Sequence, residues 1–119
     1  MANKTQEITV AEFLEMQKKP GSPKATASET DIMRSIRDFL RLHGWKVVRM
    51  QQSLGSEKGI PDLYAIRGGQ SVWIEVKTPK GRLSKYQEAW LQDLEEHGGW
   101  WIVARGIKDV EHLAGNRHV

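Results

Sequence analysis

Cysteine is absent from this chain of 119 residues. The absence excludes a disulfide framework, a thiolate zinc site and a cysteine nucleophile. The four histidines are scattered, and none pairs with another at a spacing typical of metal ligands. No stretch approaches the roughly 18 consecutive apolar residues of a membrane span, and the N-terminus lacks the basic and then apolar pattern of a signal peptide. We therefore expect a cytoplasmic protein without membrane association.

The chain also has little excess of either positive or negative charge, since its formal net charge is only +3. This value permits a polyanionic partner but does not establish one. The distribution of the charges is more informative, because Lys77, Lys80, Arg82 and Lys85 lie close together in the sequence. The length fits a single domain.

Hydrophobic periodicity and turn residues divide the chain into alternating helices and strands. Helices are expected over 10–18, 28–43 and 84–97 and near 107–113, and strands over 45–50, 62–67, 71–77 and 100–104. The segment 18–24 has the composition of a linker, so we expect a helical appendage and linker over 1–24 before a domain over 25–119. The core order α-β-β-β-α-β predicts an α/β fold in which helices flank a mixed central sheet.

Two apolar, β-branched and aromatic runs flank Gly68-Gly69. This is a hairpin signal, because both central residues of a type I′ turn need positive φ. With this turn Arg67 pairs with Gln70, and counting back places Asp62 opposite Glu75. Directly opposed side chains have Cβ atoms about 5 Å apart. At that distance two carboxylates repel by about 3 kcal/mol at an effective dielectric of about 20.

A divalent cation between Asp62 and Glu75 would turn this repulsion into binding. Lys77 lies two residues beyond Glu75 and therefore on the same face. Two carboxylates and an ammonium suit Mg²⁺-assisted hydrolysis. The alternative is a solvated charge cluster in which Lys77 neutralises Glu75. Pro61 argues against an ordinary strand before Asp62, because proline cannot donate to a ladder.

Two more polar residues lie on the apolar stripes of predicted helices. Glu29 is either a third metal ligand or, with Thr26 as the N-cap, the last member of a capping box. Gln87 is either the N3 residue of a capping box that begins at Ser84 or a hydrogen-bonding partner of the site. The two roles of Gln87 are not exclusive.

Three segments together resemble the VRR-NUC family of the PD-(D/E)xK nuclease superfamily. They are Gly59-Ile60-Pro61-Asp62, Glu75-Val76-Lys77 and Gly81-Arg82-Leu83-Ser84-x-x-Gln87. The resemblance covers roughly residues 28–112 and implies a restriction-endonuclease-like core. The short length is similar to that of stand-alone bacterial and phage members, which implies a bacterial or phage-infected host cell.

The resemblance also assigns roles to individual residues. The implied ligands of Mg²⁺ or Mn²⁺ are Glu29, Asp62, Glu75 and the backbone carbonyl of Val76. The implied catalytic residues are Asp62, Glu75, Lys77 and Gln87, of which Lys77 positions or activates the attacking water. The candidate DNA contacts are Lys80, Arg82, Ser84 and Lys85, which follow the acidic pair and include a helix N-terminus.

We expect a metal-dependent DNA endonuclease. One constellation per chain cuts one strand at a time, so paired cuts require a homodimer with two-fold symmetry. Stand-alone members of the resembled family act on Holliday junctions as dimers, which favours branched DNA as the substrate. The alternatives are a nicking or flap nuclease without junction preference, and a DNA-binding module that keeps the fold without cutting.

Overall fold

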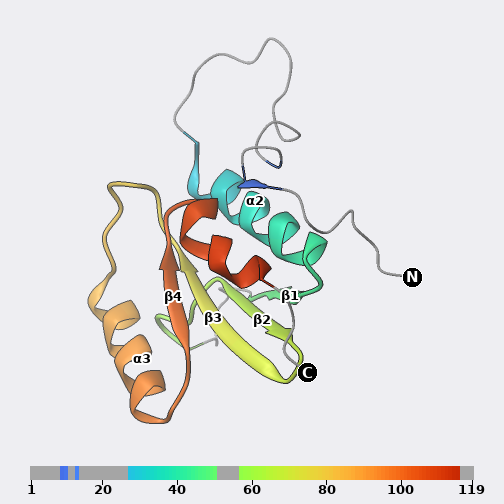
Figure 1. Ribbon diagram of the computed structural model, residues 1–119. Coiled ribbons are helices and arrows are strands. Elements are labelled where there is room, and N and C mark those ends of the chain that lie inside the picture. The colour runs from blue at the N-terminus through green and yellow to red at the C-terminus, as the bar shows by residue number, and fades with distance from the viewer. Residues whose placement is uncertain (1–8, 11–12, 14–26, 51–56, 116–119) are drawn as a thin grey trace.

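The computed structural model describes residues 9–10, 13, 27–50 and 57–115. The elements in chain order are α2 (Glu29–Leu42), β1 (Lys46–Arg49), β2 (Leu63–Arg67), β3 (Gln70–Val76), α3 (Lys85–Glu96), β4 (Trp101–Ala104) and the 3-10 helix η2 (Ile107–Ala114) (Figure 1). The order confirms the expected α-β-β-β-α-β core, and the boundaries of these elements lie within one residue of the expected ranges. None of the described helices is long and apolar enough to cross a membrane.

The four strands form one mixed sheet in the order β1-β2-β3-β4. The first three strands are antiparallel neighbours, while β4 runs parallel to β3. A parallel neighbour requires a crossover connection, which α3 supplies. The crossover brings the C-terminal ends of β3 and β4 to the same edge of the sheet (Figure 1).

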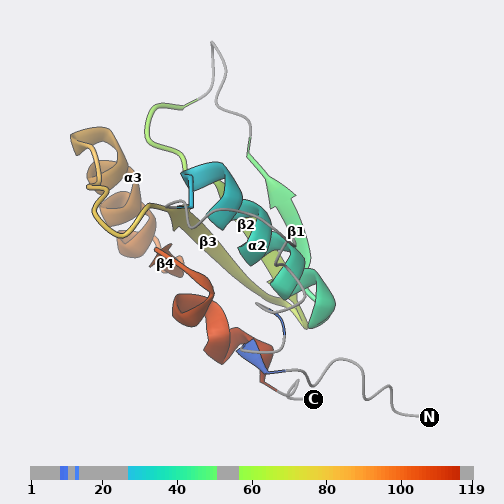
Figure 2. The same ribbon diagram turned by 90° about the horizontal axis from the view of Figure 1, so that it is seen from above.

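Helices cover both faces of this sheet. On one face, α2 and η2 contact each other and the strands, whereas α3 packs on the other face, where Trp90 meets Trp73 (Figure 2). The main core lies under α2 and η2 and contains fully buried side chains such as Phe39, Ile74 and Val110. Each such side chain contributes about 1.5–3 kcal/mol through its removal from water.

The N-terminal segment contributes to the same core through Val10 and Phe13, which are helical and buried. The Phe13 ring packs edge-on against Phe39, with ring centroids 5.2 Å apart. The rest of the helix predicted over 10–18 and the linker predicted over 18–24 lie outside the described residues. The predicted split between 1–24 and 25–119 stays a prediction.

Candidate active site

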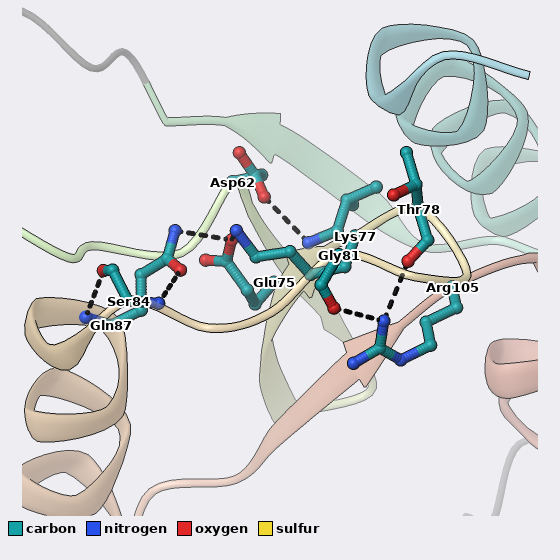
Figure 3. Close-up of polar contacts among 9 residues, drawn as sticks. Asp62, Glu75, Lys77, Thr78, Gly81, Ser84, Gln87 and Arg105 are labelled. Atoms are coloured by element: carbon teal, nitrogen blue, oxygen red, sulfur yellow. Dashed lines mark hydrogen bonds and ion pairs between the residues drawn. The ribbon is translucent and has the colours of Figure 1, made fainter.

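The β2–β3 hairpin has the register expected from its glycines. Gly68 and Gly69 have φ angles of 59° and 82°, and Arg67 pairs with Gln70. The next carboxylate beyond the paired residues, Asp62, lies against the end of β3 (Figure 3). Its Oδ2 accepts a hydrogen bond of 2.7 Å from the backbone amide of Val76. Asp62 is therefore held in place by the neighbouring strand.

Glu75 is buried near the C-terminal end of β3, with 1% of its surface exposed. Its Oε2 accepts a hydrogen bond from Gln87, while its Oε1 is buried and has no hydrogen-bond partner. The pKa of Glu75 is raised to about 8, chiefly by burial and next by the Asp62 carboxylate, against the opposing effect of Lys77. A carboxyl group in this state gains strongly from a cation, because the cation stabilises its charged form.

Gln87 fills both roles that the sequence allowed. The Gln87 side-chain oxygen Oε1 accepts from the Ser84 backbone amide at 2.9 Å. The Gln87 backbone amide donates to Ser84 Oγ at 3.1 Å, which completes the capping box of α3. Its Nε2 donates to Glu75 Oε2 at 3.0 Å. A side-chain amide can do both because its oxygen accepts while its nitrogen donates (Figure 3).

Lys77 follows β3 directly and turns its ammonium back toward Glu75. Its Nζ lies 3.6 Å from Glu75 Oε2, and the side chain is only 12% exposed. The Lys77 backbone amide donates to the Ala104 carbonyl at 3.0 Å. The catalytic set expected from the sequence, Asp62, Glu75, Lys77 and Gln87, is therefore brought together (Figure 3).

Glu29 is the first residue of α2, and the capping role considered for it is wrong. Ser28 is the N-cap, and Asp31 completes the box, because Ser28 Oγ accepts from the Asp31 amide at 3.1 Å. Glu29 instead lines a cavity of about 70 Å³ together with Asp62 and Val76. The α2 N-terminus thus faces the acidic end of the hairpin.

The basic turn, residues 77–85, joins the site to α3. Lys80, Arg82 and Lys85 are exposed, and Ser84 caps the helix. Nothing in the described geometry tests their contact with DNA, which stays a prediction.

Arg105 anchors the basic turn, and the sequence reasoning missed it. Its Nη1 donates to the carbonyls of Thr78 at 2.8 Å and Gly81 at 2.6 Å (Figure 3). The Pro79 carbonyl lies 3.3 Å from the same nitrogen. The signal that could have found it is the pairing of β4 with β3. Val76 is in register with Ala104, so the residue after β4 lies beside the residue after β3.

Comparison with models of protein families identifies the family of this chain. The model of the VRR-NUC domain matches residues 4–108. This protein belongs to the VRR-NUC family. The match begins well before the region that the motifs alone delimit, and it confirms the resemblance read from them. The protein is therefore a nuclease, a hydrolase that acts on DNA.

Solved structures support the same fold. A VRR-NUC domain aligns with 77% of this chain and 100% of its own, with a TM-score of 0.64 and 19% identity. The Holliday junction resolvase Hjc of Archaeoglobus fulgidus aligns over 63% of this chain and 65% of its own, with a TM-score of 0.50 and 26% identity. The VRR-NUC chain thus has the restriction-endonuclease-like fold expected from its sequence. No curated protein gives a significant match.

Nucleases of this fold usually need a divalent metal, and the site of the VRR-NUC chain fits one. Asp62, Glu75 and the Val76 carbonyl offer oxygen donors, which Mg²⁺ and Mn²⁺ prefer. Glu75 Oε1 is a buried acceptor without a partner, and the adjoining cavity has room for an ion and water. In the described part of the chain, no three His, Cys, Asp or Glu side chains converge closely enough to hold a metal. The fit therefore depends on two carboxylates and a backbone carbonyl, with Glu29 across the cavity.

Proposed function

We propose that this VRR-NUC protein is a metal-dependent, structure-selective DNA endonuclease that acts as a homodimer on branched DNA such as Holliday junctions. One observation carries the proposal. A buried carboxyl group with an unpartnered oxygen, Glu75, lies between an ammonium from Lys77 and a second carboxylate from Asp62. This arrangement is poor for stability but suits a site that receives a cation and a phosphate.

Asp62, Glu75 and the Val76 carbonyl would hold Mg²⁺ or Mn²⁺, with Glu29 as an outer ligand that acts from across the cavity through water. When bound, the ion supplies positive charge beside the scissile phosphate and makes a water in the site more acidic. Hydrogen bonds within the protein orient both carboxylates before an ion binds. The Val76 amide fixes one Asp62 oxygen, and Gln87 fixes one Glu75 oxygen, which leaves the other oxygens to act as ligands.

Lys77 would position the attacking water and stabilise the negative charge that develops on the phosphate. Its low exposure supports this role, because an ammonium in a partly desolvated site interacts more strongly with an anion than one in bulk water. In-line attack would leave a 5′-phosphate and a 3′-hydroxyl, as in the nuclease superfamily.

The substrate would be held by the basic turn. Lys80, Arg82 and Lys85 are exposed next to the site and would neutralise phosphates on either side of the cut. The N-terminus of α3 at Ser84 adds the positive end of its helix dipole. We expect the protein to work in the cytoplasm of a bacterium or a phage-infected cell.

The described residues hold one such constellation per chain. Paired cuts across a junction therefore need two copies, which a two-fold homodimer provides. The likeness to Hjc, a Holliday junction resolvase, supports a junction as the substrate. A nicking or flap nuclease and a non-cleaving DNA-binding module are the outcomes that would replace this proposal.

The decisive experiment is cleavage of an end-labelled four-way junction with Mn²⁺, beside a flap and a plain duplex of the same sequence. EDTA and Lys77→Ala serve as controls. We expect symmetric cuts in the junction that both controls abolish. Equal cutting of all three DNAs would overturn the junction preference but keep the nuclease. DNA binding without any cutting by the wild type would overturn the enzyme.

A further inference from the structure

Tyr86 is the most exposed large hydrophobic side chain among the described residues, with 59% of its surface accessible. The other tyrosine behaves differently, because the Tyr64 ring is half-buried and packs on Trp73 with centroids 4.8 Å apart. The Tyr86 ring gains little from the core, so packing does not explain its place in the sequence.

The position of Tyr86 ties it to the candidate active site. It is the second residue of α3 and directly precedes Gln87, whose side chain reaches Glu75. Its backbone is closely held. A Cβ atom at position 59 would collide with the Tyr86 carbonyl oxygen, so the chain before Asp62 passes in direct contact with this turn of the helix. An exposed ring therefore stands on a fixed backbone beside the site.

A cation accompanies the ring. The Nζ of Lys58 lies 4.9 Å from the centroid of the Tyr86 ring, within the range of a cation–π contact. Lys85 and Arg82 are exposed one and four residues before Tyr86. The Tyr86 ring thus has one cation in contact and two more close by in the sequence. Proteins combine exposed aromatic rings with cations to bind nucleotides outside a duplex, since the ring stacks on a base while the cations neutralise phosphates.

We propose that Tyr86 and Lys58 form a stacking site for an unstacked nucleobase next to the scissile phosphate. The inference rests on the proposed function and adds the source of its preference for branched DNA. In a continuous duplex both faces of each internal base are covered by its neighbours. At an open branch point or in a single strand a base face is free, so only such DNA gains the stacking contact without the disruption of a continuous stack.

The test uses the full chain carrying Lys77→Ala, which prevents cleavage during binding. A four-way junction with 2-aminopurine at the branch point is compared with a continuous duplex of the same sequence. We expect Tyr86→Phe to bind both DNAs as its parent does. Tyr86→Leu and Tyr86→Ala should each lose about 10-fold in affinity for the junction and less than about 2-fold for the duplex. The parent should quench the 2-aminopurine fluorescence, and Tyr86→Leu should not.

Trp100→Ala is the matched control, because Trp100 is also exposed but follows the far end of α3. It should leave both affinities unchanged. Equal losses on junction and duplex for Tyr86→Leu, or no loss on either, would overturn the stacking site. So would a change of sedimentation from dimer to monomer in Tyr86→Ala, which would make the ring a protein contact. Junction cleavage by the chain with native Lys77 is measured in parallel, so that failure of the stacking site is distinguished from failure of the nuclease proposal.

Discussion

The side-chain amide of Gln87 donates to Glu75 Oε2 across 3.0 Å and so joins the first turn of α3 to the buried end of β3. The same side chain completes the capping box with Ser84. The helix start and the carboxylate orientation therefore depend on one residue, and two substitutions can separate them.

Gln87→Glu keeps an N3 residue that suits a capping box but removes the donor to Glu75. We expect a modest fall in melting temperature and a fall in cleavage of at least about 10-fold, since Glu75 loses its fixed orientation and gains a repelling neighbour. Ser84→Ala is the reciprocal variant. It should cost about 1 kcal/mol of stability, measured by urea unfolding, and affect cleavage less. If Ser84→Ala reduced cleavage more than Gln87→Glu does, Gln87 would act only as a helix cap.

Glu75 should make the metal-free protein less stable at high pH. Its pKa is about 8 in the folded protein against the ordinary value of 4.5, so the folded state binds more protons than the unfolded state between these two values. The free energy of unfolding should therefore fall as the pH rises through that window. Thermal melts in EDTA at several pH values measure this slope. Glu75→Gln should flatten it, and an unchanged slope in that variant would contradict the assignment.

Metal binding should stabilise the wild type and not Asp62→Asn. At 100 times the dissociation constant a ligand adds about 2.7 kcal/mol, which is a clear rise in melting temperature. Because Glu75 must lose a proton to become a ligand, the apparent affinity for Mn²⁺ should increase as the pH approaches about 8. Asp93→Asn removes an exposed carboxylate of α3 and should respond to Mn²⁺ as the wild type does.

Glu29→Gln should weaken Mn²⁺ binding without abolishing it, since Glu29 lines the cavity with Asp62 but lies across it from the pair Asp62 and Glu75. Titration calorimetry measures the dissociation constant of Mn²⁺ for Glu29→Gln and for the wild type. An affinity equal to that of the wild type would remove Glu29 from the ligand set and leave the pair Asp62 and Glu75.

Gly59→Ala tests the close contact between the chain before Asp62 and α3. Gly59 has a φ of 86°, and an added Cβ would collide with the Tyr86 carbonyl. Gly98 has nearly the same φ, 83°, but open space around the added atom. Gly98→Ala is therefore the matched control. Both Gly59→Ala and Gly98→Ala bear the strain of a left-handed conformation, about 1–2 kcal/mol. Urea unfolding should show a larger loss for Gly59→Ala, accompanied by lower cleavage. Equal losses would mean that the contact relaxes freely.

Arg105→Ala should destabilise the basic turn, because three backbone carbonyls lose the donor that serves them. A loss of about 1–3 kcal/mol is expected from urea unfolding. Lys108→Ala removes an exposed cation a few residues away and controls for net charge. If both variants lose the same stability, the contacts of Arg105 do not hold the turn.

Local chemistry in the sequence determined the elements, their boundaries and the hairpin register. Gly68-Gly69 specified a turn with positive φ at both positions, and from that turn the placement of Asp62 beside the end of β3 followed by counting. Helical periodicity and capping residues delimited α2 and α3 to within one residue, although Ser28 rather than Thr26 caps α2. These features depend on neighbours a few residues apart, which a sequence displays directly.

Tertiary structure alone decided how the site is closed and charged. The parallel pairing of β4 with β3 places Arg105 beside the turn after Lys77, although the two are far apart in the chain. The packing of α3 buries Glu75 and raises its pKa, and the start of α2 brings Glu29 to the cavity of Asp62. Burial and long-range contact depend on the order in which strands join a sheet. No local pattern encodes that order, so the sequence named the carboxylates but not the environment that gives them their chemistry.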